Sequence, residues 1–347
     1  MKREIFIGRV GVGGRHPVSL QSMTTTPTAD SRATLTQIRA LARAGCDIVR
    51  VAVPDTASLV GLRAIVRRSP LPVVADIHFD AELALRSLDC GVHGLRINPG
   101  NIGGAKNVAR ILRLANERGV PIRIGVNAGS LEKKYRRTDL SRPEAMVRSA
   151  LDKVKFCEDH GFLAIKISLK SSHVRHTVEA YRLLDRRCDY PLHVGITEAG
   201  TFLQGTVKSA IGIGALLLEG IGNTIRVSLT ADPLEEVRVG REILKALQLR
   251  SNGIELISCP ACARTSVDII ARVQEFEARA ARLPIRRTLR VAVMGCEVNG
   301  PGEAADADIG IAFSRNHGFI FERGRIRERV PAREGVRRLL QRLKDMA

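Results

Sequence analysis

Three cysteines near the C-terminal end have a spacing that suits a metal centre. Cys259 and Cys262 form a C-x-x-C pair in the segment SCPACART, and Cys296 follows in MGCEVNGPGEA. A single C-x-x-C pair is compatible with a redox dithiol, half of a zinc site or part of an iron–sulfur site. The third thiol, in a similar turn-rich loop, favours a metal centre. The fourth ligand stays open, because His317 would complete a zinc site and Glu303 would complete an iron–sulfur site.

A second group of polar side chains lies in runs that are otherwise apolar. An arginine inside DIVRVAV or TIRVSL is costly to bury unless its charge is matched. Arginine also binds phosphate oxygens through two parallel hydrogen bonds. Several such cations at one rim therefore predict a site for more than one phosphate, with a purely structural ion-pair network as the alternative. The residues are Arg50, Arg96, Arg123, Asn127, Lys166, Lys170, Arg226 and Ser228.

Two acids accompany these cations. Asp76 ends the run LPVVAD, and Glu198 follows PLHVGI. Both are candidates for acid–base chemistry, and the alternative for each is to balance the arginine charge. His78, close to Asp76, is more typical of a satisfied rim histidine than of a catalyst.

The elements that must position these residues alternate along the chain. Short β-rich runs are separated by amphipathic stretches such as DSRATLTQIRALARAG, and glycines stand where helices are expected to end. The eight runs are 18–23, 47–53, 71–77, 93–98, 120–126, 162–169, 191–196 and 223–229. Eight β–α units predict a parallel (β/α)8 TIM-type barrel, whose catalytic groups follow the C-terminal ends of the strands. A doubly wound sheet is the competitor, but no G-x-G-x-x-G or P-loop motif is found.

The polar turn RSNG at 250–253 predicts a boundary between two domains. Residues 1–250 are expected to form the barrel and residues 251–347 a smaller α+β domain. The elements expected in the second domain are strands at 254–257, 289–294, 308–313 and 318–322 and helices at 264–281 and 332–346.

Composition narrows the class of partner. The formal net charge of +19 favours anionic partners. Only 3% of the residues are aromatic and no nucleic-acid-binding module is found, so a nucleic-acid partner is not expected. No apolar run is long enough for a membrane span, and the N-terminus lacks the pattern of a signal peptide. We therefore expect a cytoplasmic protein with no membrane partner and with reduced thiols.

Taken in order, a series of segments resembles the 4-hydroxy-3-methylbut-2-enyl diphosphate synthases, in their bacterial two-domain form. The resemblance extends over almost the whole chain. It rests on QSMTTTPTAD, AGCDIVRVAVP, ADIHFD, RINPGNIG, IRIGVNAGSLE, HVGITEAGT, IRVSLTADP, SCPACART and MGCEVNGPGEA. The chain departs from the family at Ala261 and Ala263, where Ser and Gly are more common, but every expected metal ligand is present.

This resemblance implies an enzyme of the non-mevalonate isoprenoid pathway. The second domain would be ferredoxin- or sulfite-reductase-like and would hold a 4Fe-4S cluster on Cys259, Cys262, Cys296 and Glu303. A head-to-tail homodimer is implied as well. The implied substrate is 2-C-methyl-D-erythritol 2,4-cyclodiphosphate, reduced with two electrons from flavodoxin or ferredoxin.

The resemblance also assigns roles within the barrel. Glu198, with Asp76 near it, would donate or position a proton. The residues implied to bind the diphosphate are Arg50, Arg96, Arg123, Asn127, Lys170, Arg226 and Ser228. The alternatives are a zinc-stabilised barrel acting on a phosphate ester and a basic nucleic-acid-binding protein.

Overall fold

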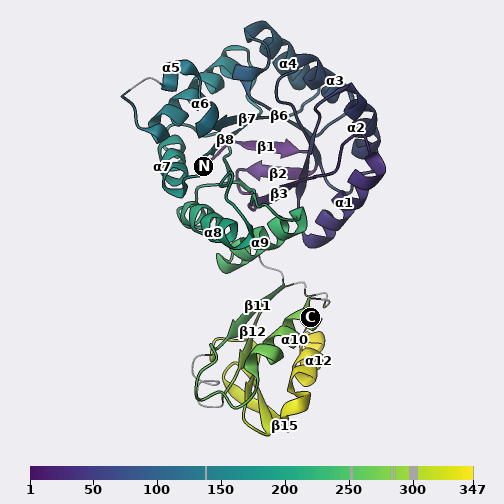
Figure 1. The fold of residues 1–347 in the computed structure, drawn as a ribbon, viewed down its shortest axis with the longest axis vertical. Helices are drawn as coiled ribbons and strands as arrows, with labels where there is room; N and C mark the ends of the chain where they lie inside the picture. The colour runs from purple at the N-terminus through teal and green to yellow at the C-terminus, as the bar shows by residue number, and fades with distance from the viewer. Residues whose placement is uncertain are drawn as a thin grey trace. The chain divides into compact units, whose positions relative to one another are not determined.

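The computed structural model describes residues 1–136, 139–250, 253–281, 283, 285, 287–296 and 304–346. Within this part the chain divides into two units, Met1–Leu247 and Gln248–Ala347. The first unit is an α/β barrel, and the second is a smaller α+β domain (Figure 1). This confirms the predicted fold class. The functions expected of the two domains stay predictions.

Eight strands form the wall of the barrel, in the order β8-β7-β6-β5-β4-β3-β10-β9, and neighbouring strands run parallel. A parallel bridge between Ile167 and Leu192 joins the two ends of this order and closes the ring. The strands are β3 (Ser19–Met23), β4 (Ile48–Ala52), β5 (Val73–Asp76), β6 (Gly94–Ile97), β7 (Ile122–Asn127), β8 (Ile165–Lys170), β9 (His193–Val194) and β10 (Thr224–Ile225).

Helices surround this wall, as Figure 1 shows. Several begin at an aspartate whose carboxylate accepts a backbone N–H of the first turn, as Asp55 does from Ser58. Helix α1 ends at Gly45, whose φ of 96° is a left-handed conformation that favours glycine. The main helices are α1 (Ser31–Ala44), α2 (Thr56–Arg68), α3 (Ala81–Asp89), α4 (Ala105–Glu117), α6 (Arg142–Asp159), α7 (Val174–Asp185), α8 (Phe202–Leu218) and α9 (Pro233–Ala246). Three short turns, η1 (Pro99–Asn101), η2 (Ala128–Ser130) and α5 (Lys133–Arg136), lie in the loops.

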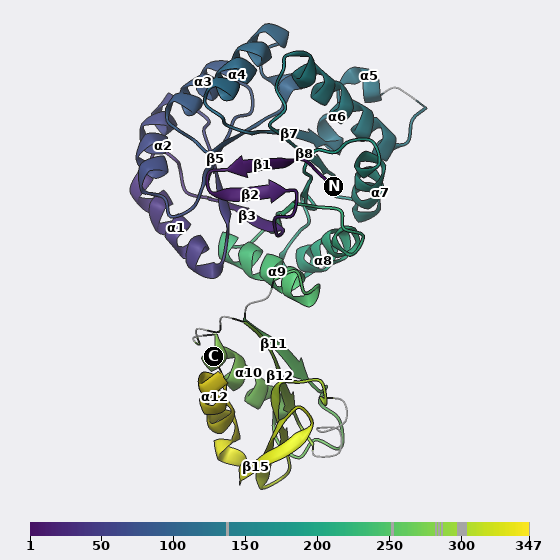
Figure 2. The same ribbon diagram turned by 180° about the vertical axis from the view of Figure 1, so that it is seen from behind.

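An antiparallel hairpin that the sequence analysis did not predict closes one mouth of the barrel. Its strands are β1 (Glu4–Ile7) and β2 (Val10–Gly13). Apolar side chains of the hairpin pack with Ile48 and Val74, which stand at or near the starts of β4 and β5. Both views show the hairpin crossing the centre of the ring (Figures 1 and 2). The hairpin therefore seals the N-terminal end of the strands, opposite the end where barrel enzymes place their chemistry.

The second unit is a five-stranded sheet in the order β11-β12-β13-β14-β15. The first three strands are parallel and the last two pairs are antiparallel. Helices α10 (Ile269–Ala280) and α12 (Gly335–Met346) pack with the sheet in one apolar core, and η3 (Ala332–Glu334) precedes α12. The strands are β11 (Gly253–Ser258), β12 (Thr288–Met294), β13 (Ile309–Phe313), β14 (His317–Glu322) and β15 (Arg325–Pro331).

Two details of this unit differ from the sequence expectation. Helix α10 begins at Ile269 rather than near 264, because the Asp268 carboxylate accepts the N–H of Ala271 and caps the helix there. The preceding residues are thereby left to form the loop that carries Cys262. Strand β15 was not predicted, because its alternating charges leave it largely exposed. Within the described residues, no helix combines the length and apolar character needed to cross a bilayer.

Candidate active site and metal centre

The inside of the barrel is lined by every second residue of each strand. In β4, Val49 and Val51 belong to the apolar core between strands and helices, so Arg50 between them faces inward. The same alternation in β8 turns Lys166 and Lys170 toward the interior. Charged residues within apolar runs are therefore lumen residues. The sequence analysis expected them at the C-terminal rim, but Arg123 and Lys166 are the second residues of β7 and β8 and so lie deeper in the barrel.

The strand register places four charged residues in one row. Asp76 of β5 stands opposite Arg96 of β6, Arg96 opposite Arg123 of β7, and Arg123 opposite Lys166 of β8. Residues paired in this way lie about 5 Å apart at Cβ, where like charges repel. Three neighbouring cations with a single acid at one end leave the row with unbalanced positive charge.

Asp76 neutralises part of this positive charge, and its exposed fraction is 3%. Its carboxylate lies 3.2 Å from Arg50 Nε and 2.9 Å from Arg96 Nη1. Burial alone would raise the pKa of Asp76, but the charge of Arg50, a hydrogen bond from His78 and the charge of Arg96 hold it well below its usual range. Asp76 is therefore a permanent anion that orients two arginines.

Glu236 of helix α9 is a second buried carboxylate, and the sequence analysis missed it. Its Oε2 lies 3.7 Å from Arg226 Nη2 and accepts a hydrogen bond from the Ser22 hydroxyl at 3.2 Å, while Oε1 accepts the Leu229 N–H at 3.0 Å. A sequence signal existed, because Glu236 lies on the same helical face as the buried residues Gly240 and Ile243.

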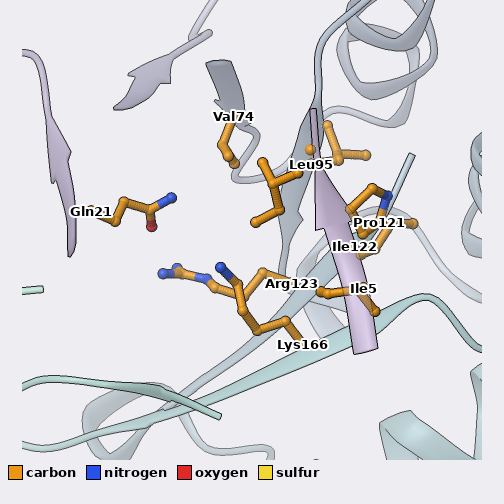
Figure 3. Close-up of a pocket in the computed structure, with 10 residues that line it drawn as sticks. Ile5, Gln21, Val74, Leu95, Pro121, Ile122, Arg123 and Lys166 are labelled. Carbon is orange, nitrogen blue, oxygen red and sulfur yellow. The ribbon is translucent and has the colours of Figure 1, made fainter. Parts of the chain in front are cut away.

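Deeper in the barrel lies a cluster of cationic and polar groups. Lys166 donates to Thr224 Oγ1 at 3.3 Å, and Arg123 Nη1 lies 3.4 Å from His193 Nδ1. Arg123 and Lys166 extend toward Gln21 beside a cavity of about 10 Å³, the size of one water molecule (Figure 3). His193 sits in the apolar run PLHVGI, so the rule that singled out the arginines would also have found it.

Burial and the repulsion between neighbouring cations lower the pKa values of three bases in this interior. Burial, followed by the charges of neighbouring cations, lowers the pKa of Lys166, Lys170 and His193. Among the buried residues that the structure describes, the acids of the lumen are Asp76 and Glu236. In the same part of the chain, several buried polar atoms have no hydrogen-bond partner, and they include Nε of Arg96, Arg123 and Arg226. Buried arginine N–H groups without partners favour an anion bound between the arginines.

The remaining predicted barrel residues stand at the C-terminal ends of strands. Asn127 is half-buried at the end of β7, opposite Lys170 in register. Ser228 is half-buried and follows Arg226 by two positions. Glu198, beyond β9, is exposed and has a φ of 51°, a left-handed conformation that is rare and costly for this residue type. Such strain is frequent at functional sites.

The predicted metal ligands lie at one edge of the second unit. Strands β11, β12 and β13 are parallel, so the loops after β11 and β12, which carry Cys259, Cys262 and Cys296, leave the same edge of the sheet. The N–H of Gly295 donates to Cys259 Sγ at 3.1 Å, which ties the two loops together. The Arg264 N–H and the Thr265 hydroxyl lower the pKa of the exposed Cys262 thiol.

These thiols suit a soft metal centre, since deprotonated sulfur and N–H···S bonds are typical of iron–sulfur ligands. Glu303 lies outside the residues that the structure describes. Within the described part, no group of three or more His, Cys, Asp or Glu residues is arranged to hold a metal ion. His317 instead lies within 3.1 Å of Arg329 Nη2 through its ring nitrogen. The other cysteines, Cys46, Cys90, Cys157 and Cys188, pack in or against the barrel core.

Two domain models of one protein family, and relatives that share half or more of its residues, match this chain. The family model described as the GcpE TIM-barrel domain matches residues 2–241, and that described as the GcpE protein C-terminal domain matches residues 255–345. A relative from Geobacter sulfurreducens is 58% identical, over 95% of this chain and 93% of its own. One from Caldanaerobacter subterraneus is 52% identical, over 100% of this chain and 97% of its own. Both are named 4-hydroxy-3-methylbut-2-en-1-yl diphosphate synthase (flavodoxin).

Among solved structures, dihydropteroate synthase from Yersinia pestis is similar to the chain. It is 12% identical with a TM-score of 0.52, and the match covers 72% of this chain and 98% of that one. At this identity the similarity concerns the fold alone.

Replacing Asp76 with Asn tests its role as the anion that holds two arginines. We expect Asp76→Asn to lower the free energy of unfolding at neutral pH by about 3–5 kcal/mol, because two buried guanidinium groups lose their partner. The pKa of Asp76 is lower in the folded protein than the usual unfolded value of about 3.9, so its contribution is present above that pH and declines below about pH 4. Denaturant unfolding at several pH values should show a flatter acid limb for the variant.

The matched control is Asp89→Asn, which removes an exposed ion pair with Arg118. We expect it to change stability by less than about 1 kcal/mol. Equal effects of the two substitutions would contradict the role given to Asp76.

Proposed function

Because the chain belongs to the GcpE family, we propose that it converts 2-C-methyl-D-erythritol 2,4-cyclodiphosphate into (E)-4-hydroxy-3-methylbut-2-enyl diphosphate. The reaction is a reductive ring opening with dehydration in non-mevalonate isoprenoid biosynthesis, and the enzyme is an iron–sulfur oxidoreductase. The observation that carries the proposal is the barrel lumen, where at least five buried cations face two buried carboxylates among the described residues.

The electrons and protons of this reaction can be balanced. The ring C–O bond breaks and leaves its oxygen on the diphosphate as an anion. The neighbouring C–O bond breaks as the hydroxyl takes one proton and leaves as water. A C=C bond forms between the two carbons, which requires two electrons. The protein therefore has to hold a diphosphate, deliver one proton and receive two electrons from a donor.

The diphosphate would bind at the C-terminal mouth of the barrel. Arginine suits this task, because its fork matches two phosphate oxygens at once. The unpartnered Nε atoms in the lumen are donors that the substrate would satisfy. Since Asp76 and Glu236 already fix the guanidinium groups of Arg50, Arg96 and Arg226, binding requires little reorganisation. The proposed set is Arg50, Arg96, Arg123, Asn127, Lys170, Arg226 and Ser228.

Glu198 and Asp76 would have different roles in this site. Asp76 is held as an anion by its arginines, so it would position them rather than donate a proton. Glu198 is exposed beyond β9, where it can exchange protons with solvent, and it would deliver a proton to the leaving hydroxyl. Its left-handed backbone supports a functional reason for its position.

Cys259, Cys262 and Cys296 would hold a 4Fe-4S cluster, with Glu303 as the fourth ligand. The Gly295 N–H to Cys259 and the lowered pKa of Cys262 support thiolate ligands at this edge. When bound, the cluster would pass on the two electrons of the reaction one at a time and would supply a Lewis acid for a substrate oxygen. In this account residues 1–250 bind the substrate and residues 251–347 hold the cluster.

Flavodoxin is the proposed electron donor, as named for the relatives, and ferredoxin is the other acidic carrier that the resemblance implied. The homodimer that the resemblance implies stays a proposal. A cytoplasmic location fits the need for reduced thiols and also stays a prediction.

Anaerobic reconstitution with iron and sulfide tests the proposed function directly. We expect brown protein with about four irons per chain that turns over the cyclodiphosphate with dithionite as reductant. Cys296→Ser should lose iron and turnover, because a ligand is removed. The matched control Cys188→Ser should keep both, because Cys188 packs against the barrel core.

Two outcomes would favour the alternatives. Colourless protein that holds one zinc would indicate a zinc-stabilised barrel. Salt-sensitive binding to nucleic acid without turnover of the cyclodiphosphate would indicate a nucleic-acid-binding protein.

Substitution of Glu198 separates backbone strain from chemistry. We expect Glu198→Gly to raise the free energy of unfolding by up to about 1 kcal/mol, because glycine adopts a positive φ without strain. The same variant should lose at least about tenfold in kcat with dithionite, because the proton donor is gone. Glu198→Gln should lose kcat without gaining stability. Unchanged kcat in both variants would refute a role for the carboxyl group.

A further inference from the structure

A groove runs along the cysteine-bearing edge of the second unit. We call it the Cys296 groove; its volume is about 420 Å³. Its lining comes from the loop after Cys262, from the end of β12, and from the connection between β13 and β14. The lining residues are Arg264, Ser266, Cys296, Phe313, Ser314, Arg315, Asn316 and His317.

Ser266 connects the walls of the groove. The Ser266 N–H donates to the Gly295 carbonyl at 3.1 Å, and its hydroxyl lies 3.4 Å from the carbonyls of Gly295 and Phe313. The loop at Arg315 is closed by the Ser314 N–H, which donates to the His317 carbonyl at 2.8 Å. Hydrogen bonds therefore link the cysteine loops to the start of the Arg315 loop.

The charge of this surface is positive. Arg264 and Arg315 are exposed, and in the described part of the chain no carboxylate lies within ion-pair distance of either. None of the residues that line the groove is acidic. A third cation, Arg329, is exposed beside it and contacts the His317 ring. Cations without acidic partners, clustered next to a thiol, form a complementary surface for an acidic protein.

We propose that the Cys296 groove is the docking surface for the electron donor, an acidic flavin-carrying protein of the flavodoxin type. This inference rests on the proposed function, which requires two electrons to reach the thiol-bound centre. Cys296 lines the groove, so a donor seated there would reach the centre through one of its ligands. Each docking event passes one electron from the reduced flavin to the chain, and two successive events complete the reaction.

The opposite edge of the same sheet offers a matched control. Strands β14 and β15 are antiparallel, so the turn after Glu322 and the residue Arg325 lie at the end of the sheet away from the cysteines. Arg325 is exposed, like Arg315, and belongs to the same unit. Charge reversal at Arg325 therefore changes the net charge by the same amount without altering the groove.

The experiment compares Arg315→Glu and Arg325→Glu in the reconstituted full chain with two reductants. With reduced flavodoxin, we expect Arg315→Glu to raise the KM for flavodoxin at least about tenfold and to weaken its salt dependence, because steering charge is lost. Arg325→Glu should stay within about twofold of the wild type. With dithionite, which needs no docking surface, both variants should turn over the cyclodiphosphate at the wild-type rate.

Each other outcome overturns the inference in a recognisable way. Equal flavodoxin KM values for the two variants would place the donor elsewhere. Loss of dithionite-driven turnover in Arg315→Glu would assign the groove to the substrate or to a second copy of the chain. Absence of dithionite-driven turnover in the wild type would refute the proposed function itself, and with it the docking surface. Direct titration of flavodoxin onto the wild type and Arg315→Glu gives the same comparison without turnover.

Discussion

The structure depends on one constraint, the burial of many like charges inside a closed ring of strands. Arg96, Arg123 and Lys166 stand side by side in register, and removing each from water is unfavourable. Asp76 and Glu236 compensate part of this charge and hold the guanidinium groups at set positions. The hairpin of β1 and β2 covers the strand starts with apolar side chains, so we expect an anion to reach these cations from the other mouth.

The same geometry serves both units of the chain. In each, parallel strands end at one edge, and the loops that follow bring together residues far apart in sequence. In the proposed function, the barrel would bind a substrate among the cations of its lumen, and the smaller sheet would hold its metal centre on the thiols at this edge. The division matches the chemistry, because a diphosphate needs fixed hydrogen-bond donors and electron delivery needs soft ligands close to a surface.

Much of the barrel could be predicted, because the sequence signals are local. A charged residue inside an apolar run, near the end of a predicted strand, was enough to select Arg50, Arg96 and Lys170. The sequence analysis missed Glu236 because it is on a helix and faces the lumen only when α9 packs on the strands. The sequence analysis missed the hairpin because each of its strands has four residues, and it missed β15 because most of that strand is charged and exposed. The choice of Glu303 rested on family resemblance, and no contact of the described residues bears on it.

The central claim is that the buried cations of the barrel are completed by a bound diphosphate. Titration calorimetry of the cyclodiphosphate into the full chain, in two buffers of different ionisation enthalpy, tests it most directly. Burial and repulsion lower the pKa of Lys166, Lys170 and His193 in the free protein, and an anion would raise them again. The account predicts tight binding with proton uptake, and weaker binding to Arg226→Ala. Binding without proton uptake and with unchanged affinity in Arg226→Ala, or no binding, would contradict it.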